Sequence, residues 1–228
     1  MEDDKEKEGM DRKKDIIKTI KEIAGRYSEY EVFTDWIRCM ALSISNSVQL
    51  FHNSVWQDRE KVYLDTIKKY NEEEAQALSR LMGMLAETME AKMQDVLGSI
   101  YMDAGMGSKA AGQFFTPYHL SQVCAELTVP EPDDTGKIHI NEPSCGGGGM
   151  VIAAADALRR KGVNYQKSME VVAQDLDWKA VYMCYVQLSL YGIRAVCVQG
   201  NTLTDPYIEG KTAEENILVT PAKRGMLI

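Results

Sequence analysis

Long apolar runs, paired cysteines and a basic excess are all missing from this sequence, and each absence excludes a class of protein. No stretch of the 228 residues approaches the roughly 18 to 20 consecutive apolar residues of a membrane span. The cysteines form no CxxC pair, which argues against a disulfide framework and a zinc site; they are Cys39, Cys124, Cys145, Cys184 and Cys197. Buried free thiols are the favoured interpretation.

Basic residues are outnumbered, with 26 Lys and Arg against 34 Asp and Glu, so the net charge is -8. A protein that binds DNA by itself usually carries a basic surface that neutralises phosphates. Short basic patches, such as Arg159 to Lys161, are typical of solvated helix ends. Any contact with DNA is therefore expected to need a partner chain.

The first residues, MEDDKEKEGMDRKK, have no apolar signal core, which predicts a cytoplasmic protein without a secretory address. Proline is also absent before Pro117, and residues 1–108 are expected to form a helical domain. Within it, Asn71 and Glu74 form a capping-box pattern, and apolar residues then recur at helical spacing as far as Ile100. This pattern predicts one long amphipathic helix.

The period changes after a small-residue linker at 106–112, and residues 109–228 are expected to form an α/β domain. Short apolar runs predict strands at 137–141, 169–174, 193–198 and 216–219. Helical runs at 150–161 and 178–191 lie between them. Strands that alternate with helices indicate a parallel sheet, in which ligands bind beyond the carboxyl ends of the strands.

Four consecutive glycines, Gly146 to Gly149, follow the first predicted strand and precede a helix. Glycine there allows a tight turn and a close approach of ligand to backbone. The loop lacks the GxxxxGK[ST] phosphate-binding pattern and a clean GxGxxG. Asp175 ends the next predicted strand, where an acid can accept hydrogen bonds from a ribose diol. These features predict nucleoside binding, whereas Asp177 is expected to cap the helix that begins at Trp178.

Other chemistry is less well supported. The thiol of Cys145 in the glycine loop could act as a nucleophile, but the sequence shows no matched base. His52, His119 and His139 have no partner at metal-ligand spacing, so structural roles are favoured and no metal is expected.

Four segments in order resemble the adenine-N6 DNA methyltransferases of type I restriction–modification systems, including phage or mobile-element relatives. They are GQFFTP at 112–117, EPSCGGGG at 142–149, QDLD at 174–177 and GNTL at 200–203. The resemblance implies a Rossmann-like class I methyltransferase sheet and S-adenosylmethionine as cofactor. It also implies site residues: Phe115, Thr116 and Pro117 at the methionine end; Glu142, Cys145, Gly146 and Gly148 at the floor; Asp175 at the ribose; and Asn201 at the adenine edge.

The sequence departs from the family pattern at three places. Glu142 and Asn201 each stand where the family usually has Asp, although Asn keeps one acceptor oxygen. The catalytic [DNS]PP[FY], whose aromatic ring stacks on the flipped adenine, is replaced by TPAK at 220–223. Thr220 and Pro221 are the candidate catalytic residues of this degenerate motif, and the chain is expected to lack the part of the sheet after its fourth strand.

Several functions stay open. The first is transfer of a methyl group from S-adenosylmethionine to N6 of adenine in DNA, impaired or dependent on a partner such as a specificity-type subunit or a second copy. The second is a catalytically inactive relative with a binding or regulatory role, which the TPAK segment and the acidic charge favour. A methyltransferase for another substrate is the third.

Overall fold

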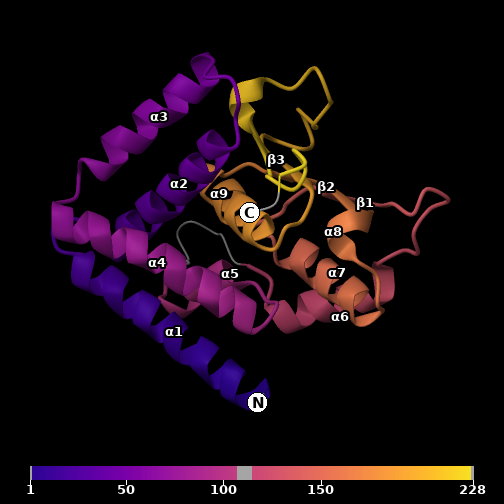
Figure 1. Cartoon of the computed structure of the whole chain (residues 1–228), viewed down its shortest axis with the longest axis horizontal. Coiled ribbons are helices and arrows are strands. Elements are labelled where there is room, and N and C mark those ends of the chain that lie inside the picture. The colour runs from indigo at the N-terminus through magenta and orange to yellow at the C-terminus, as the bar shows by residue number, and fades with distance from the viewer. Residues whose placement is uncertain (1, 107–114, 227–228) are drawn as a thin grey trace. The chain divides into compact units, whose positions relative to one another are not determined.

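The computed structural model describes residues 2–106 and 115–226 and divides the chain into two compact units, Met1–Phe114 and Phe115–Ile228 (Figure 1). The domain boundary predicted at 108 and most of the predicted linker lie at 107–114, outside the described residues. None of the helices in the described parts is long and apolar enough to span a membrane.

The first unit is helical. Its helices are α1 (Glu2–Ile23), α2 (Glu29–Ser47), α3 (Ser54–Ile67), α4 (Glu72–Ala91) and α5 (Val96–Asp103). Helix α1 packs against α4, and α2 packs against α3. The capping box at Asn71 and Glu74 is confirmed, with the Asn71 side chain accepting from the Glu74 N–H at 2.9 Å. Large apolar side chains fill the core, among them Ile16, Phe33, Trp36, Leu81 and Leu97.

The prediction of one continuous helix from Asn71 to Ile100 is wrong. Helix α4 ends at Ala91, and Lys92 takes an extended conformation. Asp95 then starts α5 by accepting a hydrogen bond from the Gly98 N–H at 2.8 Å. A Cβ at Gly98 would lie 2.1 Å from this carboxylate, so the cap requires glycine there. The apolar stripe continues across the break, which is why periodicity alone did not show it.

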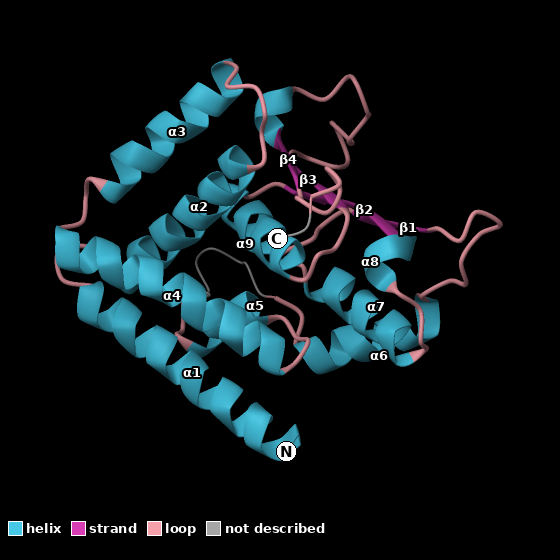
Figure 2. Cartoon of the chain, in the orientation of Figure 1, coloured by secondary structure: helices cyan, strands magenta, loops and turns pink. Residues whose placement is uncertain are grey.

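The second unit has the predicted α/β architecture (Figure 2). Its sheet has the order β1 (Ile138–Glu142), β2 (Met169–Asp175), β3 (Ala195–Gln199), β4 (Ile217–Val219). The first three strands are parallel as predicted, but β4 runs antiparallel to β3, with Val219 opposite Val196. The helices are α6 (Tyr118–Thr128), α7 (Gly149–Arg160), α8 (Tyr165–Ser168) and α9 (Trp178–Leu190), with a 3-10 turn at Glu214–Asn216.

One face of the sheet is covered by α7 and α9. Helix α7 is rich in alanine, and the run from Val151 to Leu158 is buried, because small side chains let it lie close to β1 on one side and α6 on the other. Both helices begin directly beyond the carboxyl end of a strand. Their first turns therefore flank the place where the sequence predicts a ligand.

Candidate functional site at the carboxyl ends of the strands

The glycine loop after β1 has a backbone that other residues adopt only with strain. Gly146 has φ +51° and Gly148 has φ +94°, both in the left-handed region. Neighbouring side chains also leave no space for a methyl group. A Cβ at Gly146 would lie 2.8 Å from the ring of Phe115, and one at Gly148 would lie 3.2 Å from Cys184 Sγ. The structure thus explains glycine at both positions.

The loop is tied to the end of β2. The N–H of Cys145 donates to the backbone oxygen of Gln174 at 2.9 Å, and the N–H of Gly146 donates to Asp175 Oδ2 at 2.9 Å. Asp175 Oδ1 accepts from the Asp177 N–H at 3.0 Å. Each carboxylate oxygen has a further lone pair. The side chain of Asp175 is half-buried, so it is fixed in place and can still accept from a ligand.

Two more side chains hold the glycine loop from other directions. Gln187 on α9 is buried and donates to the backbone oxygen of Gly147 at 2.7 Å. From the loop after β3, the Thr202 hydroxyl donates to the backbone oxygen of Pro143 at 2.7 Å. The loop is therefore organised by its neighbours without a ligand.

Two acidic side chains from adjacent strands lie near each other at this end of the sheet. Glu142 ends β1, and its carboxylate accepts from the Ser144 N–H at 3.2 Å. Burial, together with the negative charge of Asp175, raises the pKa of Glu142 above its usual value. A cationic ligand group placed here would relieve this cost.

Cys145 does not have the surroundings of a nucleophile. Its buried thiol interacts with the thiol of Cys184. This contact, together with burial, raises the pKa of Cys145 well above its ordinary value. A thiol that stays protonated reacts slowly. The geometry favours a packing role beneath the glycine loop.

Phe115 lies against Gly146, while Thr116 and Pro117 are exposed. Pro117 is the N-cap residue before α6, and its backbone oxygen accepts from the Leu120 N–H at 2.9 Å. The residues at 112–114 of the first family segment are outside the described part of the chain. The structure thus brings Phe115 to the glycine loop.

The loop after β3 contains Asn201 and is held by a residue to which sequence reasoning gave no role. Asn201 is exposed, and its side-chain oxygen accepts from the Leu203 N–H at 3.0 Å. Gln174 is 2% exposed; it donates to the backbone oxygen of Asp205 at 2.9 Å and accepts from the Tyr207 N–H at 3.0 Å. The available signal in the sequence was an amide side chain, Gln174, directly before the acid that ends β2.

Sequence reasoning also missed two exposed apolar side chains at the site. Leu176 follows Asp175 and is 66% exposed, and Leu203 lies two residues after Asn201 and is 93% exposed. Exposed leucines beside a fixed acid offer an apolar surface for a flat ring. Their positions inside the QDLD and GNTL segments could have shown them.

Thr220 and Pro221 are not at this site. Strand β4 is antiparallel, so its carboxyl end lies at the amino end of β3. There the buried hydroxyl of Thr220 donates to the backbone oxygen of Ile193 at 2.8 Å and accepts from the Ala195 N–H at 2.9 Å. Pro221 is buried as well. The structure therefore separates these two residues from the glycine loop by the length of β3.

An organised glycine loop after one strand and a fixed acid at the end of the next are characteristic of α/β proteins that bind a nucleoside-containing ligand. Sequence comparison identifies the protein family within that class. The chain belongs to the N-6 DNA Methylase family, whose sequence model matches residues 92–222. Membership makes S-adenosylmethionine the cofactor of the domain. In the described parts of the chain, no group of three or more His, Cys, Asp or Glu is arranged to hold a metal ion.

A curated relative is the type I restriction enzyme MjaIX methylase subunit of Methanocaldococcus jannaschii, 27% identical over 108 residues. The match covers 45% of this chain and 18% of that protein. The matched segment therefore spans less than a fifth of that relative.

Two solved structures share a general likeness. One, from Listeria monocytogenes, is assigned to the class I S-adenosylmethionine-dependent methyltransferases; it has a TM-score of 0.49 at 10% identity, over 87% of this chain and 56% of that one. The other is a type I restriction–modification system methyltransferase subunit from Streptococcus thermophilus, with a TM-score of 0.42 at 14% identity, over 82% and 42%.

Proposed function

We propose that this chain is the cofactor-binding part of a restriction–modification type methyltransferase that acts on N6 of adenine in DNA. The observation that carries the proposal is the fixed carboxylate of Asp175, which is bonded to the left-handed glycine loop and keeps acceptor capacity toward solvent. Family membership supplies the reaction type.

The residues present fit S-adenosylmethionine, which supplies an activated methyl group. Asp175 would accept from the ribose hydroxyls, and the exposed side chain of Leu176 would lie against the purine. Asn201 would meet the adenine edge through its amide. The raised pKa of Glu142 would fall on contact with the ammonium group of the methionine part.

The remaining residues predicted for the pocket act through the backbone and by packing. Gly146 and Gly148 would let the cofactor approach the main chain, and Cys145 would fill the space beneath. Phe115, followed by Thr116 and Pro117, would border the methionine end, because its ring lies against the loop.

Action on DNA is proposed to depend on a partner. Methylation of an adenine amine needs an acceptor for its hydrogen bonds and a stacking surface for the flipped base. The hydroxyl of Thr220 is occupied at the other end of the sheet, and the net charge of -8 opposes DNA binding by the chain alone. A specificity-type subunit or another polypeptide would supply these groups.

The inactive binding or regulatory relative is the second candidate. It is favoured by the fixed position of the TPAK segment, where Lys223 forms an ion pair with Glu170 and Thr220 bonds to the strand beside it.

Transfer of a labelled methyl group from S-adenosylmethionine to adenine-containing DNA tests the proposal. The isolated chain should give background transfer, and addition of an extract from the source cells should produce transfer that an Asp175→Ala variant does not support. Robust turnover by the isolated chain would refute the partner dependence. Extract activity that is the same with the variant would exclude the chain from the reaction and leave the second candidate.

A further inference from the structure

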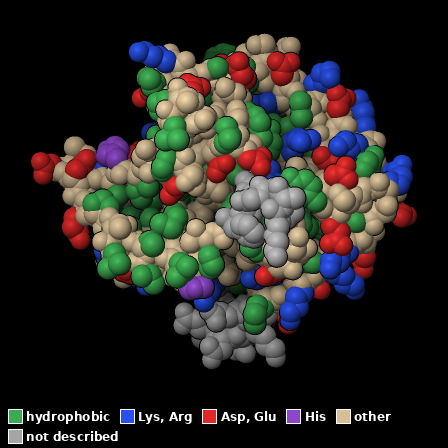
Figure 3. All heavy atoms as spheres, turned by 180° about the vertical axis from the view of Figure 1, so that it is seen from behind, with side chains coloured by type: hydrophobic (Ala, Val, Ile, Leu, Met, Phe, Trp, Pro, Cys, Tyr) green, Lys and Arg blue, Asp and Glu red, His purple; other side chains and the backbone are tan. Residues whose placement is uncertain are grey.

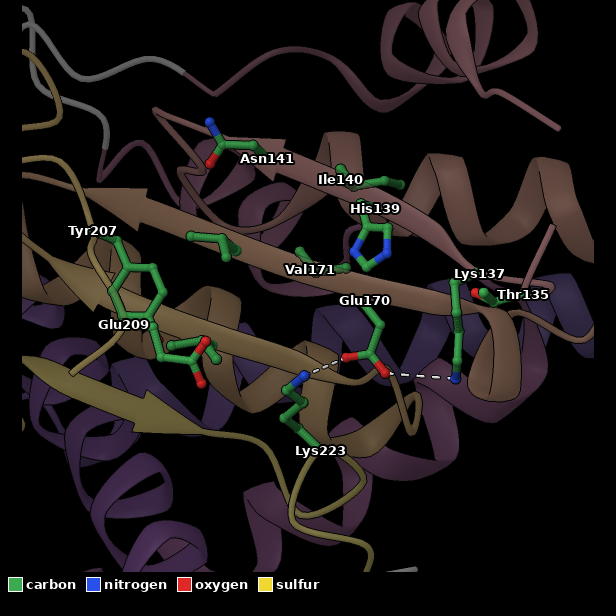
Figure 4. A pocket seen from close by; sticks show the side chains of 12 residues that line it. Thr135, Lys137, His139, Ile140, Asn141, Glu170, Val171, Tyr207, Glu209 and Lys223 are labelled. Carbon is green, nitrogen blue, oxygen red and sulfur yellow. Dashed lines mark hydrogen bonds and ion pairs between the residues drawn. The ribbon is translucent and has the colours of Figure 1, made fainter. Parts of the chain in front are cut away.

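The face of the sheet opposite α7 and α9 carries an open trough of about 740 Å³. Val172 and Val196 line the trough. Asn141 lines it from β1 (Figure 4). Among the described residues of the second unit, no helix packs closely on this face. Parallel strands are normally covered on both faces. The trough has an apolar part, with Val172, Val196 and Tyr207, and polar or charged side chains such as Lys137, His139 and Glu170 border it. A helix with a narrow apolar stripe and charged ends would match this mixed lining.

The two ends of the trough differ in charge. At the amino ends of the strands, three cations surround the single carboxylate of Glu170: Arg194 at 2.7 Å, Lys137 at 3.7 Å and Lys223 in a direct ion pair. At the carboxyl ends, Tyr207 and Glu209 form the wall (Figure 4). One end thus has an excess of positive charge and the other carries an acid.

This charge pattern selects the direction of a helix. A helix that lies antiparallel to β2 places its carbonyl end, which carries partial negative charge, over Lys137 and Lys223. Its amide end, which carries partial positive charge, then lies near Glu209. The preferred occupant is a helix with an apolar stripe and with acidic residues at or after its carboxyl end.

Helix α6 of the same unit has these properties. Its inner face, with Ser121 and Ala125, is buried against α7. Its outer face presents Leu120, Val123 and Leu127, which are 48%, 57% and 81% exposed. Figure 3 shows hydrophobic side chains gathered over the part of the surface where α6 lies. The spacing i, i+3, i+7 places the three side chains in one stripe.

The segments next to α6 match the ends of the trough. Beyond its carboxyl end the chain carries Glu131 and Asp134, both exposed, which would face the lysines. At its amino end His119 is exposed and would approach Glu209. The two acids and the helix dipole therefore favour the same orientation.

We propose that α6 of one copy of this chain docks into the trough of a second copy. The contact joins two different surfaces, so it is heterologous and can extend to further copies or close into a ring. This self-association does not depend on methyl transfer.

Sedimentation velocity over a wide concentration range tests the contact, with two variants that remove one surface each. Leu127→Glu places a charge on the helix stripe, and Asn141→Arg fills the trough. Both positions are exposed, so folding should be retained, as thermal melting followed by circular dichroism would verify. The wild-type chain should associate with rising concentration, and each variant alone should stay monomeric.

Leu50→Glu is the matched control, because Leu50 is also 81% exposed but lies in the loop between α2 and α3 of the first unit. This control should associate like the wild type. A mixture of the two variants is the sharpest test: one retains the trough and the other retains the helix, so they should form a complex of one copy of each and stop there. A monomeric wild type, unchanged association of either variant, or no complex in the mixture would overturn the proposal.

Discussion

The two ends of the sheet in the second unit differ in whether their polar groups are already hydrogen-bonded within the protein. At the carboxyl ends, left-handed glycines and the half-buried acids Glu142 and Asp175 leave polar groups available to a ligand. At the amino ends, the hydroxyl of Thr220 and the ion pairs of Glu170 satisfy polar groups internally. The comparison teaches that a functional motif and a structural one can be distinguished by whether their hydrogen-bonding capacity is already used.

The largest effect is expected at the carboxyl ends, for Gly148→Ala. The new Cβ would be held at φ +94° and 3.2 Å from Cys184 Sγ, so either the loop shifts or the helix does. Unfolding free energy should fall by about 1–3 kcal/mol. Affinity for S-adenosylmethionine should fall at least about tenfold, which corresponds to 1.4 kcal/mol. Thermal melting and calorimetry measure the two effects.

Gly83→Ala is the matched control, since Gly83 lies within α4 and nothing is within 4 Å of its added Cβ. Helix propensity predicts a gain in stability of up to about 1 kcal/mol. Cofactor affinity should not change. If the two glycine variants lowered affinity equally, the special role of the loop backbone would be disproved.

Substitutions of Thr220, at the amino ends of the strands, should change the stability of the protein and leave its affinity for S-adenosylmethionine unchanged. Thr220→Val removes a fully buried hydroxyl that both donates and accepts, so unfolding free energy should fall by about 1–3 kcal/mol. Thr220→Ser keeps the hydroxyl and should recover most of this loss. Cofactor affinity of both variants should equal that of the wild type. A loss of affinity without a loss of stability would place Thr220 at the site after all.

The smallest effect is a pH dependence from Glu142. Burial raises its pKa above 4.5, so the folded state holds the proton more tightly than the unfolded state does. The contribution of this group to the free energy of unfolding is therefore highest below pH 4.5 and falls as the pH rises through the folded-state pKa. Glu142→Gln removes this fall.

The difference in melting temperature between the Glu142→Gln variant and the wild type should therefore shift in favour of the variant as pH rises from about 4 to 7. A difference that is constant over this range would contradict the buried, charged carboxylate.

Local chemistry explains which parts of this architecture sequence reasoning could predict. The sequence predicts β2 within one residue at its carboxyl end, because MEVVAQ is a short apolar run that ends just before the N-cap of α9. The expected N-cap at Asp177 is confirmed, since its side chain accepts from the Lys179 N–H at 2.8 Å. A glycine loop after a strand is likewise a local pattern.

Features that depend on distant pairing could not be predicted in this way. A three-residue strand such as β4 has no signal for its neighbour or direction, so the position of Thr220 followed from pairing with β3. The role of Gln174 depends on a loop about thirty residues further along the chain. The exposed stripe of α6 needed the structure, because periodicity shows a stripe but not which face is covered.

Calorimetric titration with S-adenosylmethionine is the most direct test of a cofactor site at the carboxyl ends of the strands. The unaltered chain, Asp175→Ala, and the control Asp134→Ala at an exposed acid elsewhere in the same unit would be compared. Saturable one-site binding by the chain and the control, weakened at least about tenfold in Asp175→Ala, is the predicted result. No binding by the unaltered chain, or equal binding by Asp175→Ala, would contradict it.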